Sequence, residues 1–305
     1  MDVSRFCSAT RLLIVAGKGG VGKTTVTAAL AKMNADAGRK SLIIEVEGKS
    51  GIGNVFGRRD LLTYEEVELA PAVAARTLTP DDALLEYLRD HGMKRISTRL
   101  MQSGALDVVS TAVPGLKDIL VLGKVKQLER AGDELLVLDA PAAGHAVTFL
   151  TSAAGLLDAA RVGPIRTQAQ DVVDLLSDPE RCQVVLVTLP EETPVNEVVE
   201  TAYKLEDRVG IKLGPVVVNG VYPRLEELDD DDFPVEGLTA GQSSALREAA
   251  AFRRSRQELQ AEQLRRLDDA LPLPQLRLPF LFTPEVGPGE LEVLAAELAK
   301  QVEAL

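Results

Sequence analysis

The sequence contains few of the residues on which several classes of protein depend. Among its 305 residues there are two cysteines and two histidines. Cys7 and Cys182 are far apart and form no Cys-x-x-Cys pair, so they predict neither a disulfide framework nor a zinc site. The ligands of an iron–sulfur cluster are lacking as well. Two unpaired thiols are typical of a reducing compartment, and we expect a cytoplasmic protein.

Net positive charge and long apolar runs are also lacking. The 46 acidic side chains outnumber the 34 basic ones, for a net charge of −12, which repels a phosphate backbone. We therefore expect no nucleic-acid partner. Residues 1–10 lack the apolar core and cleavage site of a signal peptide. The longest weakly polar run, 140–157, includes His145, glycines and hydroxyl residues, and it predicts a buried loop and helix rather than a membrane span.

The sequence does contain a set of short apolar runs, enough for a sizeable core, since 46% of its residues are hydrophobic. The runs cover residues 12–16, 41–46, 135–138, 184–187, 215–218 and 276–280. Several are continuous rather than alternating, as in strands buried on both faces of a parallel sheet. Polar residues stand at the ends of four of them, where ligands gather in such sheets. We predict an α/β fold of three layers with a mostly parallel central sheet.

One long segment, residues 58–132, separates the second run from the third. Its pattern is mainly helical, over residues 80–91, 93–102 and 116–131. Such a stretch is too long for a simple crossover. We predict one domain, residues 1–305, in which 58–132 is a helical insertion and a candidate partner subdomain. Extra helices of the core would produce the same pattern.

Two further segments follow the fifth apolar run. Residues 225–236 are rich in acidic side chains and predict a solvated loop, and residues 245–271 predict a charged helix.

A glycine-rich loop follows the first apolar run and precedes a helical pattern. Residues 17–25 read Gly-Lys-Gly-Gly-Val-Gly-Lys-Thr-Thr and fit the phosphate-binding pattern Gly-x-x-x-x-Gly-Lys-Ser/Thr. Glycines let backbone N–H groups curl around phosphate oxygens, and the following helix adds its positive dipole end. Lys23 is expected to reach the β- and γ-phosphates, Thr24 to ligate Mg²⁺, and Thr25 to contact the α-phosphate. The residues expected to bind ATP here are Gly17, Lys18, Gly19, Gly20, Val21, Gly22, Lys23, Thr24 and Thr25.

Two charged residues narrow this prediction. Lys18 directly follows the first glycine, which marks the deviant form of the loop. The usual role of such a second lysine is to cross a dimer interface and neutralise the partner's nucleotide, as an arginine finger does. The alternative is a solvent-facing lysine. Asp139 ends an apolar run, where an aspartate holds Mg²⁺ through water or accepts a hydrogen bond from Thr24, unless it caps a helix.

The loop, two acidic switch positions and the last third of the sequence resemble the ArsA-type ATPases. That family includes arsenite-pump ATPases and ATPases that target tail-anchored membrane proteins. Residues 47–50 lie where the family has its first switch, and 139–145 resemble its second switch, in which His145 could relay the phosphate state or simply cap a backbone group. The resemblance implies that Asn219 reads the adenine edge. It also implies that Pro279 belongs to the loop that closes over the base.

Departures from the family pattern concern turnover and cargo. Glu47 replaces the first-switch aspartate that positions the attacking water, so hydrolysis is expected to be slow or Glu47 to act as the base after a small shift. A misplacement of about 1 Å can cost on the order of 100-fold in rate. The zinc-binding and arsenite-binding cysteines are absent, so metalloid transport is not predicted. The insertion holds two of only four methionines, and a methionine-rich client groove is not evident.

Three functions follow from the resemblance. The leading expectation is an ATP-hydrolysing dimeric switch with Lys18, Lys23 and Glu47 as catalytic residues, Thr24 and Asp139 as metal residues, and a possible protein client. The second is a regulatory nucleotide-binding subunit paired with a more active paralogue. The third is a surface-positioning ATPase, which the acidic end of the sequence disfavours because such proteins bind membranes through a basic helix. No stable membrane anchor is expected.

Overall fold

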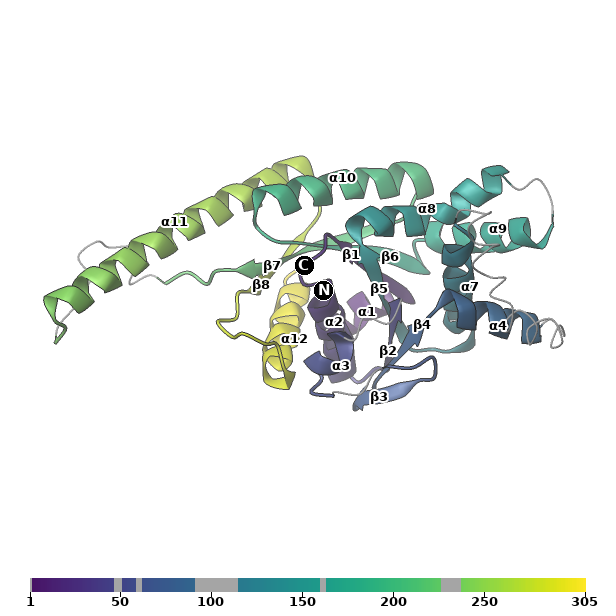
Figure 1. The fold of residues 1–305 in the computed structure, drawn as a ribbon, viewed down its shortest axis with the longest axis horizontal. Helices are drawn as coiled ribbons and strands as arrows, with labels where there is room; N and C mark the ends of the chain where they lie inside the picture. The colour runs from purple at the N-terminus through teal and green to yellow at the C-terminus, as the bar shows by residue number, and fades with distance from the viewer. Residues whose placement is uncertain (1, 47–50, 59–61, 91–114, 160–162, 226–236) are drawn as a thin grey trace.

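The computed structural model describes residues 2–46, 51–58, 62–90, 115–159, 163–225 and 237–305. Its described strands form one eight-stranded sheet in the order β3-β4-β2-β5-β1-β6-β7-β8 (Figure 1). Only the β3–β4 pair is antiparallel among the strand pairs of this sheet. The predicted α/β fold with a mostly parallel central sheet is thereby confirmed.

Five of the six apolar runs become inner strands of the sheet, and the sixth becomes the edge strand β8. In β1, β2 and β6 every residue is buried. The strands are β1 (Leu12–Gly17), β2 (Ser41–Val46), β3 (Val67–Ala70), β4 (Val73–Leu78), β5 (Leu135–Ala142), β6 (Cys182–Thr188), β7 (Leu213–Val221) and β8 (Gln275–Pro279).

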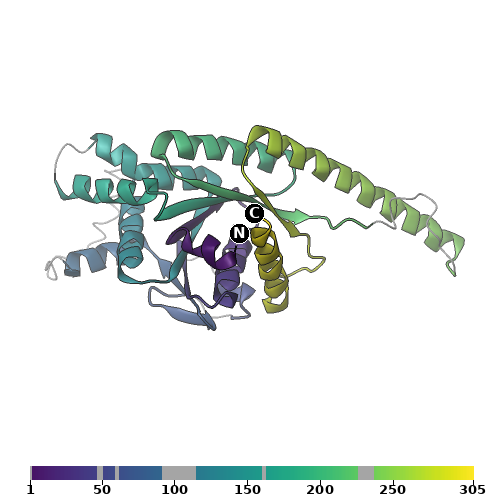
Figure 2. The ribbon, with the colours of Figure 1, turned by 180° about the vertical axis from the view of Figure 1, so that it is seen from behind.

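Helices cover both faces of the sheet (Figures 1 and 2). The first face is covered by α1 (Val3–Ser8), α2 (Lys23–Asp36), α3 (Gly51–Val55) and α12 (Pro288–Glu303). The second face is covered by α7 (Leu116–Ala131), α8 (Ala143–Ala159), α9 (Pro164–Ser177), α10 (Glu192–Val209) and α11 (Ala240–Ala270), with α4 (Pro80–Asp90) packed against α7. The three predicted layers are therefore present.

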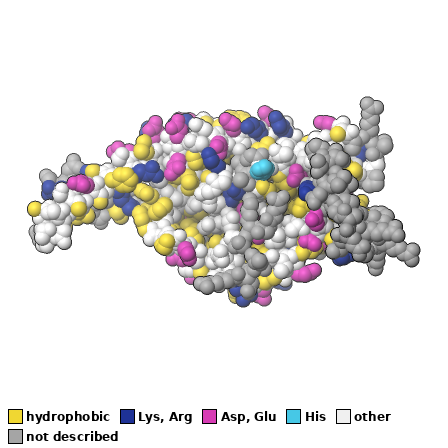
Figure 3. Space-filling view, in the orientation of Figure 1, with side chains coloured by type: hydrophobic (Ala, Val, Ile, Leu, Met, Phe, Trp, Pro, Cys, Tyr) yellow, Lys and Arg dark blue, Asp and Glu magenta, His cyan; other side chains and the backbone are white. Residues whose placement is uncertain are grey.

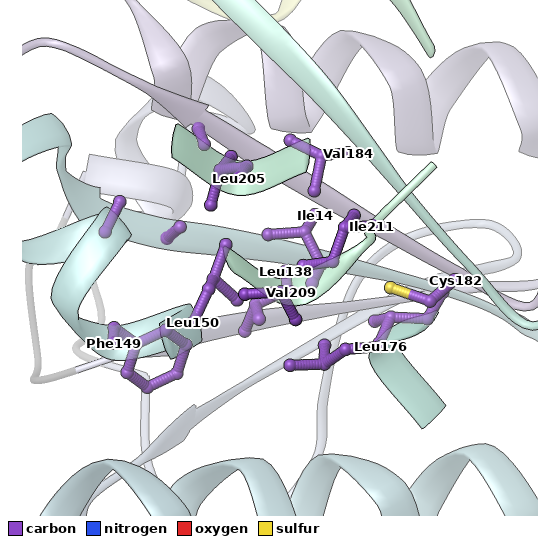
Figure 4. Close-up of a cluster of buried hydrophobic side chains, with 14 of the residues drawn as sticks. Ile14, Leu138, Phe149, Leu150, Leu176, Cys182, Val184, Leu205, Val209 and Ile211 are labelled. Atoms are coloured by element: carbon purple, nitrogen blue, oxygen red, sulfur yellow. The ribbon is translucent and has the colours of Figure 1, made fainter. Parts of the chain in front are cut away.

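Each face has its own apolar core. On the second face, Leu150 of α8 and Leu205 of α10 point toward strand residues such as Ile14 and Leu138, and Phe149 belongs to the same cluster (Figure 4). On the first face, α2 and α12 pack on the other sides of the same strands. The sheet is thus held between two hydrophobic layers, which fixes the edge where β1, β5 and β7 end.

The segment 58–132 differs from the expected pattern in its first part. The prediction of a mainly helical insertion missed β3 and β4, which extend the central sheet. Residues of β4 are mostly buried although its sequence, Val-Ala-Ala-Arg-Thr-Leu, lacks a strong apolar run. Here pairing with β2 decides the structure, because tertiary context outweighs weak local preference. Helices α4 and α7 were predicted, and residues 93–102 lie outside the described part.

Two other elements are longer than the sequence indicated. β5 does not end at Asp139 but continues to Ala142, which pairs with Gly17 after a register shift in β1. Helix α11 begins at Ala240, capped by Thr239, and its first half projects from the body as an arm (Figure 1). The predicted loop at 225–236 lies almost wholly outside the described residues.

Candidate nucleotide site

The glycine-rich loop joins β1 to α2, and two of its glycines are required by their surroundings. A Cβ on Gly17 would lie 2.3 Å from the backbone oxygen of Val187 in β6. Gly22 has a φ of +91°, and a Cβ there would lie 2.3 Å from Asn219 Nδ2. Side chains at these positions would collide with fixed neighbours or strain the backbone. The ends of β1, β6 and β7 lie so close together here that the loop needs glycine at both positions.

The first turn of α2 faces this loop without a side-chain cap. Gly22 is the N-cap residue, so no side chain accepts from the first N–H groups of the helix. Such N–H groups and the helix dipole are suited to an anion. Lys23 Nζ donates to the carbonyl oxygen of Lys18, 3.0 Å away, and so bends back over the loop. The cradle thus combines backbone donors with one ammonium group, which fits a triphosphate.

Thr24 and Asp139 meet at the end of the cradle. The Thr24 hydroxyl donates to Asp139 Oδ2 over 2.7 Å, although 115 positions separate the two residues. Asp139 is buried, with 6% of its surface exposed. While the hydroxyl proton is donated to the carboxylate, the lone pairs of Thr24 Oγ1 stay available. One hydroxyl with a nearby carboxylate matches Mg²⁺, which keeps most of its waters and uses few protein ligands.

Lys18 points away from the cradle. Its Nζ forms an ion pair with Glu197 Oε1 of α10 at 2.7 Å, and the two side chains are 37% and 40% exposed. The two lysines of one loop therefore have different surroundings: Lys23 folds over the loop, and Lys18 lies toward the second face of the sheet. The sequence predicted Lys18 as a functional residue but gave no sign of Glu197 as its neighbour.

The other end of the site is formed by β7 and β8. Asn219 Nδ2 donates to the carbonyl oxygen of Val21 over 3.0 Å, which ties the end of β7 to the phosphate loop. Pro279 ends β8, and the N–H of Phe280 donates to Val221 O over 2.8 Å. The structure thus brings Asn219 against the loop at Val21 and Gly22 and places Pro279 at the end of the neighbouring strand. Both lie at the sheet edge where parallel strands end, the usual place for a ligand.

The two switch segments are described only in part. Glu47 lies outside the described residues, but Gly51, four positions later, is placed so that a Cβ would lie 3.0 Å from Thr24 Cγ2. His145 is exposed in the first turn of α8. The chain after Glu47 thus returns to Thr24, whereas His145 faces outward (cyan in Figure 3).

One buried carboxylate escaped the sequence analysis. Glu45 of β2 pairs in register with Asp139 of β5, is 1% exposed, and accepts from the Thr77 hydroxyl over 3.2 Å. In the sequence, Glu45 stands inside an apolar run, and nothing in that run marks it as a residue of the site. Two carboxyl groups therefore lie on neighbouring strands at this edge, beside the expected metal position. Pairing of β2 with β5, which no local pattern reveals, brings them together.

Neither cysteine is in a form suited to binding a soft metal ion. Burial raises the pKa of the Cys7 thiol to about 11 and also raises the pKa of Cys182, whose sulfur lies in the apolar core (Figure 4). Thiolates are the form that binds metals. Among the residues that the structure describes, no group of three or more His, Cys, Asp or Glu could hold a metal ion.

In the same residues, no helix is long and apolar enough to cross a membrane.

Comparison with known proteins agrees with this geometry. The sequence model of the family described as anion-transporting ATPase matches residues 10–160. ATPase BagA of Mycobacterium tuberculosis is 35% identical over 96% of this chain and 94% of its own length. An arsenical pump-driving ATPase of Escherichia coli is 28% identical over 72% of this chain but 40% of its own length. ATPase get3 of Schizosaccharomyces japonicus is 25% identical over 45% of this chain. The chain therefore belongs to the ArsA-type ATPase family and hydrolyses ATP.

Proposed function

We propose that this ATPase is a dimeric switch, in which ATP closes two copies, or one copy and a paralogue, around facing nucleotides. The opposite placement of its two loop lysines carries the proposal. Lys23 lies over its own cradle, 3.0 Å from Lys18 O, and can serve the nucleotide in the same chain. Lys18 reaches outward to Glu197, half-exposed, from where a facing nucleotide would be accessible. A trans-acting lysine would supply charge to the partner's phosphates as an arginine finger does.

Within each copy, the residues divide by the part of the nucleotide that they contact. Backbone N–H groups of residues 17–25 would hold the phosphates. Thr24 would ligate Mg²⁺ and Asp139 would hold it through water, because the hydroxyl already donates to that carboxylate. When bound, Mg²⁺ neutralises charge on the β- and γ-phosphates. Asn219 and Pro279 would contact the base, since both lie where β7 and β8 end.

Water activation is assigned to Glu47. It follows β2, and the chain returns at Gly51 to contact Thr24. A glutamate carries the same charge as aspartate on a longer side chain, so it can orient the attacking water only after a small shift of backbone. Slow turnover is the expected consequence.

The nucleotide state would reach the second face through β5. Asp139 lies in β5, which passes directly into α8 at Ala143. Helix α8 packs against α7, α9 and α10. A change in the strand end after Asp139 would therefore move the helical layer, which contains most of the described part of segment 58–132. We propose that this layer binds a protein client.

Dimer formation is the direct test. Light scattering with Mg²⁺ and a non-hydrolysable ATP analogue should show twice the monomer mass for the wild type. Lys18→Ala should stay monomeric while still binding the analogue. Lys32→Ala, which removes an α2 lysine that pairs with Asp36 of its own helix, should dimerise normally. A wild type that binds the analogue but remains monomeric would contradict pairing of two copies, and a mixture with the paralogue that also shows no larger species would contradict the switch.

Glu47 also motivates the second candidate, a low-activity subunit that pairs with a paralogue. Single-turnover hydrolysis by the purified chain, alone and with a paralogue, separates the two. Robust activity alone removes the subunit hypothesis. The client would be identified as a protein that copurifies with Glu47→Gln in the presence of ATP and does not copurify in the presence of ADP.

A surface-positioning ATPase receives less support. The apolar side chains of α12, including Leu291, Leu294 and Leu298, are buried against the first face of the sheet. That apolar face is therefore not available to lipid.

A further inference from the structure

We infer that Gln260 is a positioning residue for adenine recognition. It would act through Asn219, so the inference rests on the proposed base site. Gln260 lies on α11, 41 positions after Asn219. It belongs to no recognised nucleotide motif.

The Gln260 side chain pairs with both backbone groups around a bend. Its Nε2 donates to the carbonyl oxygen of Gly220 over 3.1 Å, and its Oε1 accepts from the N–H of Tyr222 over 2.8 Å. Gly220 has a φ of +70° and lies where the pairing of β7 with β8 is irregular, between Val218 and Val221, so the strand bends immediately after Asn219. Both amide atoms of a side chain that is 5% exposed are thereby used to fix this turn. Few rotamers of Gln260 can satisfy both bonds, so the turn is held in one conformation.

Two more α11 side chains hold the same segment. Arg253 Nη2 and Gln257 Nε2 each donate to Pro223 O over 2.9 Å. Residues 253, 257 and 260 are four and three positions apart, so they share one helix face. This part of the face holds the backbone that follows β7, and further along the same face Leu264 and Leu267 join the core.

The β8 side of the base site depends on the same helix. The guanidinium of Arg253 lies 5.3 Å from the Tyr222 ring centroid and 5.0 Å from that of Phe282. The rings of Tyr222 and Phe280 meet edge-on at 5.0 Å. Hydrophobic and basic side chains accordingly gather where the arm of α11 joins the body (Figure 3). Helix α11 thus fixes both strand ends between which the base would lie.

The α11 contacts lie on the opposite face of β7 from the phosphate loop, which meets β7 through Asn219. Successive residues of a strand point to opposite faces. Val218 joins the core of the second face, whereas Val217 joins that of the first. Asn219 therefore reaches Val21 on the first face while Gln260 holds the backbone from the second. Loss of Gln260 should loosen recognition of the base and leave the phosphate cradle unchanged.

The test compares three ligands: ATP, GTP and inorganic tripolyphosphate, each with Mg²⁺. Gln260→Met keeps the volume and removes both hydrogen bonds. We expect its ATP affinity to fall about tenfold, which corresponds to the loss of one or two hydrogen bonds. Its preference for ATP over GTP should fall with it, and its affinity for tripolyphosphate should stay within about twofold of the wild type. Gln260→Glu, which in its ionised form keeps the acceptor for Tyr222 but cannot donate to Gly220, should behave like Gln260→Met at a pH where the carboxylate is ionised.

Gln263→Ala is the matched control. Gln263 is a buried glutamine one turn further along α11, and it accepts from Arg266 of the same helix. Its loss should cost stability without changing the preference between ATP and GTP.

Two results would overturn the role of Gln260 alone. One is wild-type selectivity in Gln260→Met while Asn219→Ala loses it. The other is an equal loss of ATP and tripolyphosphate binding, which would mean that Gln260 only supports the fold. If the wild type binds ATP no better than tripolyphosphate, or if Asn219→Ala changes nothing, the base site itself is wrong and this inference fails with it.

Discussion

The two faces of the sheet hold their helices by different kinds of contact. On the first face, α2 and α12 pack through apolar side chains such as Leu30, Met33 and Leu298. On the second face, ion pairs join helices to one another in addition to the apolar core. They include Glu86–Lys124 between α4 and α7, Lys126–Asp171 between α7 and α9, and Lys18–Glu197 between the loop and α10.

This difference separates the first face, which supports the nucleotide site, from the second face, whose helices can rearrange with the nucleotide state. Apolar interfaces contain no charged group that a bound nucleotide could attract. Their close packing also resists small displacements. Partly exposed ion pairs are worth little individually and can be exchanged for other partners at small cost. The first face should therefore keep the nucleotide cradle rigid, and rearrangement should occur on the second face. Four predictions address this comparison, ordered from the largest expected effect to the smallest.

Asp139→Asn should have the largest effect on activity. Asparagine can still accept from Thr24 but lacks the charge that would hold Mg²⁺, so hydrolysis should fall about 100-fold. Binding of ATP without Mg²⁺ should be retained, because the cradle donors are unchanged. Steady-state hydrolysis and equilibrium binding with and without Mg²⁺ measure the two effects. Equal loss of ATP affinity in both conditions would show that Asp139 supports the loop rather than the metal.

Gly22→Ala should have the next effect, and Gly20→Ala provides its comparison. Both glycines have positive φ, +91° and +86°, so both variants carry similar backbone strain. Only the Cβ at Gly22 would displace Asn219, since nothing lies within 4 Å of a Cβ at Gly20. Gly22→Ala should therefore bind ATP about tenfold more weakly than Gly20→Ala. For tripolyphosphate, the two variants should have the same affinity. Equal ATP affinities would mean that Asn219 does not contribute to base binding.

The phosphate loop and Asp139 show why parts of the site could be predicted from the sequence. The phosphate loop is contiguous, so its glycines and Lys23 reveal it without tertiary information. Asp139 was predicted from an apolar run that ends in an acid, and its hydrogen bond with Thr24 fits that prediction.

Glu197, Glu45 and Gln260 were missed because each meets its partner through packing of distant elements. Lys18 and Glu197 are 179 positions apart, and an isolated glutamate on a helix looks like any solvated residue. Gln260 likewise lies in a charged helix whose interacting face is defined only by where β7 turns. Strands β3 and β4 were missed for the same reason, since pairing with β2 replaces the local signal.

Glu197→Gln tests whether the second face restrains the switch. Removing the charge weakens the ion pair of Lys18 within its own chain, which frees the lysine for a facing nucleotide. Because an exposed pair contributes up to about 1 kcal/mol, dimerisation with the ATP analogue should strengthen by at most about fivefold. Glu200→Gln, in the same helix and paired with Lys204, should leave dimerisation unchanged. Weaker dimerisation of Glu197→Gln would instead assign Glu197 a supporting role in the interface.

The smallest expected effect concerns acid stability on the second face. A hydrogen bond from Lys126 lowers the pKa of Asp171. A carboxyl whose pKa is lowered by folding stabilises the protein above its unfolded value, near 4, and this contribution is lost as the pH falls below it. Asp171→Asn should therefore lower the free energy of unfolding by at most about 1 kcal/mol at pH 7, since Asp171 is partly exposed. Its deficit relative to the wild type should shrink as the pH falls through the lowered pKa of Asp171.

Denaturant unfolding at several pH values measures this difference. Asp174→Asn is the control, because Asp174 of the same helix accepts from the uncharged Gln170. A deficit of Asp171→Asn that persists unchanged at low pH would mean that its cost comes from packing rather than from the ion pair. The ion pair would then not be one of the exchangeable contacts that distinguish the second face from the first.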